Sequence, residues 1–348
     1  MENKKILCFL ILILILFVVF ISGCTNIKIP FVQTDSKIPY GSGVVIEFFG
    51  GDLPDNVYYS GEEVRFFLKV KNTGSLTANE CFAELFGLDY TWKKAGETKA
   101  TTTGETFPDE EECRYTNRKL KLLPPDPEKG IEGEEIICSW RYICPDVSPG
   151  LSINLKPRAR FYYTYASSTI KTISFVSKEE LKVLQQQGKS LPIESYSKTN
   201  SPIEIDIETA TPVRTYGENK VEFPIVITVK NIGGGTPCYG NSYNCKKPGG
   251  ILENENWNKI DLKITLPPGL SPAPNSCKSS DNVITQQIVF VGPQPQKFSC
   301  KIIGEVPKQI GIVQKNIQVN ATYGYFIDKT FELTVYPSTQ PNLPKSNK

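Results

Sequence analysis

The sequence predicts an all-β protein in which one arrangement of about seven short strands is used twice. The 26 prolines and 26 glycines, with many Val, Ile, Thr, Tyr and Phe residues, favour short strands and turns over long helices. Two stretches, Val64 to Val70 and Val221 to Val229, alternate apolar and polar residues, the period-2 pattern of a half-buried strand. Short landmarks also recur in both halves of the chain. The 348 residues are enough for two domains of ordinary size.

Residues 1–23 have the order of an export signal. Two lysines precede the apolar run Ile6 to Ile21, and small residues follow it. Ile21-Ser22-Gly23-Cys24 resembles the lipobox of prokaryotic lipoproteins, in which Cys24 would be lipidated and become the new N-terminus. The alternative is an uncleaved membrane helix, although 16 apolar residues are short for a span. Either form would anchor the following domains outside the membrane.

Residues 24–42 are expected to be a tether, and residues 43–176 the first β-domain. Val64, Phe66, Leu68 and Val70 share one face of a strand. The strands expected in this half lie around 44–49, 64–71, 81–85, 114–122, 134–142, 155–165 and 170–176.

A helical linker is expected over residues 177–201. Ser177 and Glu180 fit a capping box, and Gly188 suits a helix end. The segment is either a passive spacer or a wedge whose Leu181 and Leu184 dock on a domain and fix the interdomain angle. The second β-domain is expected over 202–336, and 337–348 is expected to be a disordered tail rich in proline and polar residues.

Two landmarks support the repeat. Lys71-Asn72-Thr73-Gly74 returns as Lys230-Asn231-Ile232-Gly233, and Thr164-Tyr165 returns as Thr322-Tyr323. Thr164 follows Asn72 by 92 positions, and Thr322 follows Asn231 by 91. This alignment places the face of Phe161, Tyr163 and Tyr165 over that of Val319, Ala321 and Tyr323.

Val70 to Gly74 and Val229 to Gly233 resemble the "VKNxG" turn of CARDB-like and NEW3-like immunoglobulin-type domains. Leu266 to Leu270 is similar to the "LPxG" turn of those families, which the first half lacks. The resemblance covers residues 43–176 and 202–336. It implies two tandem seven-stranded immunoglobulin-like β-sandwiches in an archaeal or bacterial surface protein, with a role in adhesion or envelope architecture and no catalysis.

Cysteine usage favours disulfides made in an oxidising compartment. Cys8 lies in the signal and Cys24 is the lipid site, which leaves four cysteines in each half. Once the copies are aligned, Cys113–Cys138 and Cys277–Cys300 are predicted as equivalent disulfides, Cys238–Cys245 closes a local loop, and Cys81 is left for Cys144. Four cysteines allow three pairings, so other connectivities stay open, as do free thiols or a zinc site.

The composition excludes several function classes. Histidine is absent, which removes Ser-His-Asp and Cys-His mechanisms and the commonest metal ligand. The net charge of +2 does not favour nucleic acid. No carboxylate pair stands out, so the chain is interpreted as a non-enzyme without a cofactor. Calcium among Asp109 to Glu112, Glu132, Glu134 and Glu135 is the alternative to solvated acidic loops.

Five loop aromatics are candidate contacts for a protein or glycan partner: Tyr90, Trp92, Tyr239, Tyr243 and Trp257. The alternative is that they cover the ends of the sandwiches. The five residues lie in two insertions or at their edges. The first insertion, residues 87–112, follows the third strand and the second precedes it. The two are therefore expected at opposite ends of their sandwiches, which argues against a shared pocket.

Asn320-Ala321-Thr322 is a glycosylation sequon that requires an outward Asn320. The sequence thus predicts a membrane-anchored, extracytoplasmic surface protein with a structural or adhesive role. The alternative is a lipoprotein scaffold subunit of a larger membrane or envelope complex.

Overall fold

The computed structural model describes residues 42–89, 91–96, 108–191, 194–217, 219–246, 254–306 and 311–338. All of these belong to one compact unit. The signal, Cys24, nearly all of the expected tether, Tyr90 and most of the expected tail lie outside the described residues. Within the described ranges, no helix has both the length and the apolar character needed to span a membrane.

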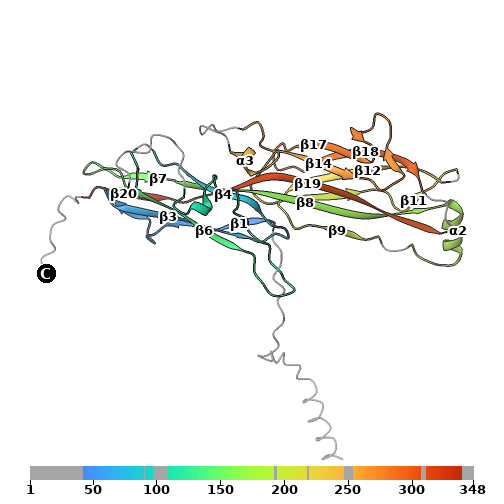
Figure 1. Ribbon diagram of the computed structural model, residues 1–348, viewed down its shortest axis with the longest axis horizontal. Coiled ribbons are helices and arrows are strands. Elements are labelled where there is room, and N and C mark those ends of the chain that lie inside the picture. Colours follow the sequence, from blue (N-terminus) through green and yellow to red (C-terminus); the bar gives the residue numbers. More distant parts are fainter. Residues whose placement is uncertain are drawn as a thin grey trace, which may run out of the picture. The chain divides into compact units, whose positions relative to one another are not determined.

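The described chain is nearly all β, as predicted, and forms several sheets (Figure 1). The first half contains β1 (Val44–Gly51), β2 (Val57–Tyr59), β3 (Glu63–Asn72), β4 (Asn79–Phe86), β5 (Lys93–Lys94), the 3-10 turn η1 (Glu111–Cys113), β6 (Glu135–Ile143), β7 (Ile153–Leu155) and β8 (Arg158–Val176). Helix α2 (Lys178–Gln186) and β9 (Tyr196–Lys198) follow.

The second half continues with β10 (Ile203–Glu208), β11 (Val213–Arg214), β12 (Lys220–Asn231), β13 (Thr236–Cys238), α3 (Ser242–Cys245), β14 (Lys259–Thr265), β15 (Leu270–Pro272), β16 (Ser279–Ser280), β17 (Val283–Val289), β18 (Gln296–Glu305), β19 (Ile312–Thr330) and β20 (Leu333–Tyr336). Two four-stranded sheets, β1-β3-β6-β5 and β10-β12-β18-β15, occupy corresponding places in the two halves. No strand forms at 114–122, where Leu122 makes only an isolated bridge to Ala78.

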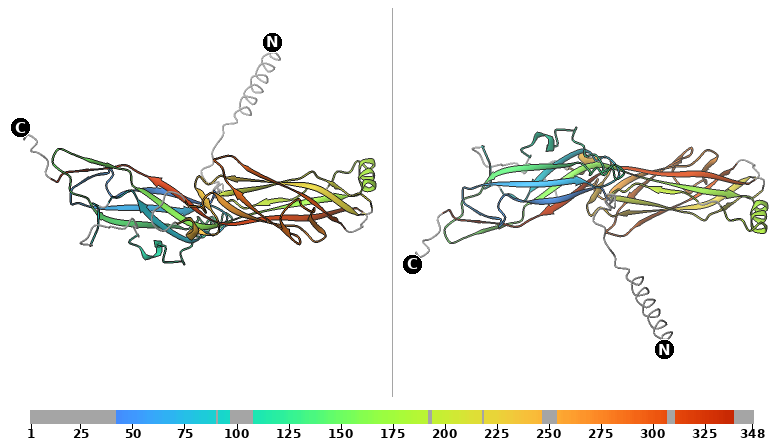
Figure 2. Two further views of the ribbon diagram at one scale, coloured as in Figure 1. Left: turned by 90° about the horizontal axis from the view of Figure 1, so that it is seen from above. Right: turned by 90° about the horizontal axis from the view of Figure 1, so that it is seen from below.

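A long ribbon of two strands runs through both halves. β8 and β19 are 19 residues each and pair antiparallel along their whole length. The stretches expected to be two strands, 155–165 and 170–176, therefore form one. In Figures 1 and 2 the green β8 and the red β19 continue from one group of strands into the other.

The first half is completed by the end of the chain. β20 pairs with β2 and β7, so the last described strand lies among strands of the first half. The sheets agree with immunoglobulin-like sandwiches. The domain bounds 43–176 and 202–336 stay a prediction. The structure shows in addition that one ribbon, β8 with β19, is shared by both halves.

Four buried tyrosines occupy the middle of the ribbon: Tyr163, Tyr165, Tyr323 and Tyr325. Tyr165 and Tyr323, which the sequence alignment treats as equivalent, are instead register partners in the ribbon. By its contacts, Tyr165 corresponds to Tyr325. The alignment was wrong by two residues, because a shift of two keeps every strand residue on the same face and leaves the apolar pattern unchanged.

A turn is present at each of the two repeated Asn-x-Gly sites, and the asparagine side chain closes it. The side chain of Asn72 donates to Leu76 O at 2.8 Å, and that of Asn231 donates to Gly235 O at 2.7 Å. A Cβ at Gly74 would lie 2.2 Å from the Tyr165 hydroxyl. The glycine is therefore required by close packing against the tyrosine.

Two disulfides hold loops over corresponding strands. Cys113–Cys138 fastens η1 to β6, and Cys277–Cys300 fastens the segment after β15 to β18. A third joins Cys238 and Cys245. These three predicted pairs are therefore present, and three disulfides indicate an oxidising, extracytoplasmic environment.

The predicted Cys81–Cys144 pair is wrong. Both cysteines are free thiols and both are buried. Cys81 lies on β4, where its thiol contacts Ala78 O, whereas Cys144 follows the end of β6. β4 pairs with the ribbon, whereas β6 belongs to the other sheet of the first half. The two cysteines left over after the other three pairings therefore belong to different sheets and do not bond.

Helix α2 begins as predicted, with the Ser177 hydroxyl accepting a hydrogen bond from Glu180 N at 3.1 Å. Its leucines are only half-buried. α2 connects β8 to β9, and β9 pairs back onto β8. The helix therefore lies in a connection within one sheet, at one end of the strands (Figure 1), and neither the spacer nor the wedge describes it.

Candidate contact surface at the junction of the two halves

A second buried cluster lies on the face of the ribbon that is opposite to the four tyrosines. Successive strand residues point to opposite faces, so Tyr162 and Phe326 turn away from Tyr163 and Tyr325. Phe82 of β4 stacks on Tyr162 with ring centroids 4.5 Å apart. Around these three rings gather Tyr115, Tyr243, Trp257 and the Cys238–Cys245 disulfide. We call this set the junction cluster.

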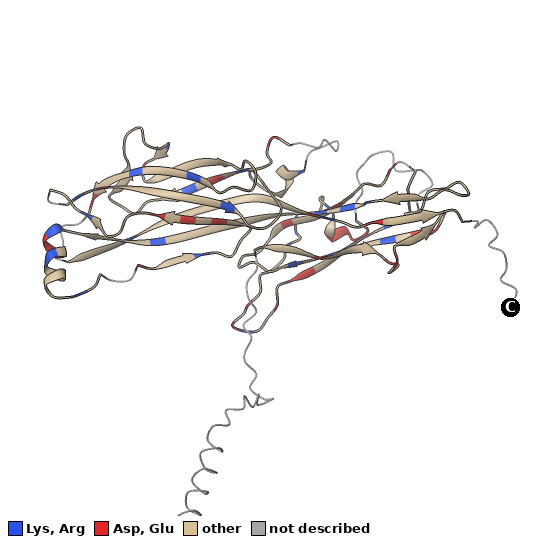
Figure 3. Ribbon diagram, turned by 180° about the vertical axis from the view of Figure 1, so that it is seen from behind, with Lys and Arg blue, Asp and Glu red and all other residues tan. Residues whose placement is uncertain are grey.

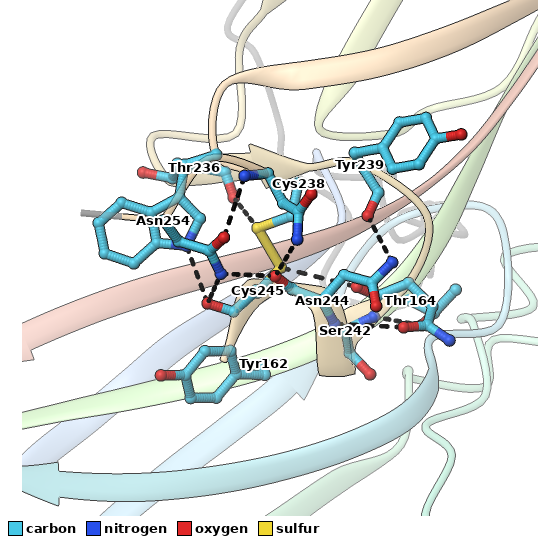
Figure 4. The surroundings of a disulfide bond; sticks show 12 residues. Tyr162, Thr164, Thr236, Cys238, Tyr239, Ser242, Asn244, Cys245 and Asn254 are labelled. Carbon is cyan, nitrogen blue, oxygen red and sulfur yellow. Dashed lines mark hydrogen bonds between the residues drawn. A yellow bond between two sulfur atoms is a disulfide. The ribbon is translucent and has the colours of Figure 1, made fainter. Parts of the chain in front are cut away.

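The disulfide loop of the second half covers the ribbon at this point. β13 pairs with β19, and α3 then lies over Gly324, where a Cβ would come within 2.1 Å of Asn241 O. The Asn241 side chain caps α3 by accepting from Asn244 N. The indole NH of Trp257 donates to Cys245 O at 2.8 Å. Figure 4 shows how the disulfide and its hydrogen bonds hold this loop together.

The same loop is bonded to the first half. Ser242 N donates to Thr164 Oγ1 at 2.9 Å, and the Ser242 hydroxyl donates to Glu80 O at 2.8 Å. The Tyr243 ring stacks on Phe82 at 5.3 Å. The insertion of the second half therefore meets β4 and β8 of the first half. The shared ribbon explains this, because β4 and β13 flank it from its two sides.

A buried ion pair braces one side of the cluster. The Arg160 guanidinium donates to both carboxylate oxygens of Asp328, at 2.6 and 2.8 Å. It also lies 3.9 Å from the ring centre of Phe326 and 5.2 Å from that of Trp257. Burial alone would lower the pKa of Arg160, but its bonds to Asp328 outweigh burial and raise it. Arg160 therefore stays charged and fixes the aromatic rings around it.

A second ion pair crosses between the halves. Lys246 Nζ lies 2.5 Å from the buried carboxylate of Glu84 and 3.9 Å from the ring centre of Tyr115. The Tyr162 hydroxyl donates to the same carboxylate at 2.9 Å. Burial, then the charge of Glu84, raises the pKa of Tyr162, so its hydroxyl keeps its proton. Lys246, Glu84 and Tyr162 therefore bond to one another and stabilise the contact between the halves. These three groups are not arranged as a nucleophile and its base.

The outer rim of the cluster is exposed and polar. Tyr239 has 40% of its surface exposed. The exposed Arg118 places its guanidinium 4.7 Å above the Tyr243 ring. Tyrosine and arginine on a fixed backbone can contact a partner with little loss of side-chain freedom.

The sequence-predicted aromatics divide between surface and core. Tyr243 and Trp257 belong to the junction cluster, and Tyr239 follows Cys238 on the same loop with its side chain exposed. Trp92 has only 1% of its surface exposed and packs against Phe66 at 6.2 Å, which matches the covering role. Tyr90 lies outside the described residues.

The predicted acidic residues are spread over separate partners. Asp109 pairs with Arg141 at 2.9 Å, Glu132 with Lys71, and Glu135 with Lys69 at 3.0 Å. Within the described ranges, no group of three or more possible metal-ligating residues gathers.

Several junction residues were missed by sequence reasoning, above all Phe82, Arg160, Tyr162 and Phe326. A signal was present in Arg160-Phe161-Tyr162-Tyr163 and in Tyr325-Phe326-Ile327, where apolar residues occupy both faces of a strand. Such a pattern predicts burial on both sides. It does not say which segment covers the outer face.

Comparisons with known proteins give only distant likenesses. No protein-family model and no curated protein matches the chain. One solved structure is the collagen binding domain of the surface protein RspB of Erysipelothrix rhusiopathiae, 6% identical, covering 85% of this chain and 97% of that one, with a TM-score of 0.13. Another is the MSCRAMM ACE of Enterococcus faecalis, 9% identical, covering 88% and 98%, with a TM-score of 0.11. At these scores neither likeness bears on the function of this chain.

Proposed function

We propose that the chain is a non-enzymatic extracytoplasmic protein, anchored to a membrane by its N-terminal segment, with a structural or adhesive role. In this role the junction cluster contacts a partner protein. The observation that carries the proposal is the loop of the second half that is bonded to β4 and β8. The loop carries Tyr239 and Tyr243, and Arg118 of the first half lies above the Tyr243 ring. Tyrosine and arginine dominate protein contacts.

The disulfides and the sequence of the first 24 residues support the cellular location. Three disulfides suit an oxidising compartment, and the lipobox resemblance ending at Cys24 supports a lipid anchor. The "VKNxG" resemblance supports a prokaryotic surface protein. Replacing Cys24→Ala tests the anchor: we expect the chain to move from the membrane fraction to the soluble fraction. A chain that stays in the membrane would indicate an uncleaved helix.

A capture experiment tests the contact surface. The tagged full chain is cross-linked on intact cells, extracted in mild detergent, and its partners are identified. We expect one partner to be lost in the double variant Tyr239→Ala and Arg118→Ala. The matched control is Tyr216→Ala, a tyrosine that is 50% exposed and lies in the second half next to β11.

The outcomes separate the two roles considered for the chain. A partner on a neighbouring cell or in the medium supports adhesion, whereas a stoichiometric membrane complex supports the scaffold. Equal recovery with the junction variant and with the control would show that the junction surface is not the contact.

A further inference from the structure

We propose that the outer face of β19 in the second half binds a neutral glycan, which goes beyond the junction contact. Five successive outward positions of this strand carry amides or a hydroxyl: Gln314, Asn316, Gln318, Asn320 and Thr322. Of the residues between them, Ile317 and Val319 are fully buried, whereas Lys315 is half-buried and donates to Pro268 O. We call the five outward residues the amide ladder. It extends along β19 toward the junction cluster, where Phe326 lies on the same face.

The ladder lacks the charges that cover the other exposed sheet faces. On the β10-β12-β18 sheet, Lys230 lies near Glu204 and Asp206, and Lys301 pairs with Glu222. The β1-β3-β6 sheet likewise carries Lys69 between Glu47 and Glu135, and Lys71 next to Glu132. Figure 3 shows Lys, Arg, Asp and Glu residues in blue and red along the strands.

Next to the ladder, the outward face of β14 carries Lys259, Asp261 and Lys263, charges of both signs with little net charge. Lys263 is the register partner of Asn320, and Asp261 lies two residues earlier on the same face. The surface around the ladder is therefore close to neutral. A ligand of either net charge would find no matching field there, whereas an uncharged ligand meets no electrostatic penalty.

The fold itself does not require this composition. With the correspondence of Tyr165 to Tyr325, the positions of Gln318, Asn320 and Thr322 correspond to Arg158, Arg160 and Tyr162 in the first half. Those positions hold the ion pair and the rings of the junction cluster. Equivalent backbone thus carries charge and aromatic rings in one half, and amides in the other.

Three hydrogen bonds with neighbouring side chains orient all four amides. Thr172 Oγ1 donates to Asn316 Oδ1 at 2.8 Å, Gln318 Nε2 donates to Asn320 Oδ1 at 3.2 Å, and Gln314 Nε2 donates to Ser174 Oγ at 3.3 Å. Among the described residues, no protein group bonds to Asn316 Nδ2, Asn320 Nδ2 or Gln318 Oε1. The ladder therefore offers oriented donors and acceptors to a ligand.

Sugar hydroxyls match this pattern because each one both donates and accepts. Preorganised amides lower the entropy cost of binding such a ligand. Ladder positions recur about every 6.8 Å along the strand, so an extended oligosaccharide can meet several of them at once. Together these observations assign the ladder to an uncharged, polyhydroxylated chain.

The experiment uses the full chain made in a bacterial host that adds no glycan at Asn320. Binding is measured to mannan, laminarin and dextran as neutral probes and to hyaluronate as an anionic probe. We expect at least one neutral glycan to bind. The double variant Asn316→Asp and Gln318→Glu keeps side-chain shape but replaces donors with charge, and we expect it to weaken binding at least tenfold.

The matched control makes the same amide-to-acid change elsewhere, at Gln294, which precedes β18, and at Gln296, the first residue of β18. It should bind as well as the wild type. Thermal unfolding checks that both variants are folded. The proposal is overturned if no neutral probe binds, if only hyaluronate binds, or if the ladder variant binds normally. Loss of the captured partner protein in the ladder variant, without glycan binding, would also overturn it. Because the junction assay uses other residues, either proposal can fail while the other holds.

Discussion

Tyr165 and Tyr325 perform the same task in the two halves of the molecule. The Tyr165 hydroxyl accepts a hydrogen bond from Leu76 N at 3.0 Å, and the Tyr325 hydroxyl accepts one from Gly235 N at 2.9 Å. Each acceptor thus holds the backbone four residues after the asparagine of a repeated turn. The two turns are fastened from the middle of the one ribbon that both halves share.

Removing either hydroxyl should weaken the fold. In Tyr325→Phe, the amide of Gly235 and the side chain of Asn231 lose a buried partner. We expect a loss of about 1–2 kcal/mol in the free energy of unfolding, and a similar loss in Tyr165→Phe. Denaturant unfolding measures both. Unchanged stability in both variants would show that these bonds do not hold the turns.

The Cys238–Cys245 disulfide should matter for the junction as well as for stability. Replacing both cysteines with serine opens a loop with a sequence separation of 7, which costs about 2 kcal/mol. We also expect faster hydrogen exchange in β4, because α3 bonds to Glu80 O.

The double variant Cys277→Ser and Cys300→Ser is the matched control. It also removes one disulfide, but on β18, away from β4, and should leave exchange in β4 unchanged. Equal acceleration in both variants would contradict a local role for the junction loop.

Cys81 and Cys144 should resist alkylation in the native protein and react after unfolding without reductant. Burial, then the nearby charge of Glu62, raises the pKa of Cys144 to about 12, and burial raises the pKa of Cys81 further. Mapping of the two peptides after iodoacetamide treatment measures this. Recovery of the two peptides unmodified and joined to each other would show that Cys81 and Cys144 form a disulfide after all.

The same shift predicts a dependence of stability on pH. The folded protein holds the Cys144 thiol neutral, whereas the unfolded thiol ionises near pH 9. The contribution of Cys144 is therefore complete below about pH 9 and declines as pH rises from 9 toward 12. The Cys144→Ala variant should show a smaller decline over this window than the wild type.

The Arg160–Asp328 pair should contribute more than an exposed pair. Asp328→Asn leaves the buried Arg160 without its counter-charge. Since the Asp328 side chain is 29% exposed, water moderates the effect, and we expect a loss of about 2 kcal/mol.

Glu332→Gln is the control for this pair. It breaks the ion pair with Lys156, whose two side chains are 71% and 76% exposed, and should change stability by less than about 0.5 kcal/mol. Denaturant midpoints compare the two variants, and equal effects would mean that burial does not strengthen the Arg160 pair.

The sequence alone was enough to locate most strands and the faces they bury. Val64 to Val70 and Val221 to Val229 alternate, and the structure confirms both as strands with those residues inside. The sequence also predicted three disulfides and the start of α2 at Ser177. Each of these depends on residues near one another in the chain, or on a spacing shared by two copies, so a local pattern can encode it.

Tertiary structure decided how the halves are joined. Nothing in the period of β8 says that it pairs with β19, because alternation defines the faces of a strand but not its neighbour. The pairing of Tyr165 with Tyr323, the meeting of Tyr243 with Phe82, and the separation of Cys81 from Cys144 all follow from that choice. Such contacts join residues far apart in sequence, and only the packing of the whole chain selects among them.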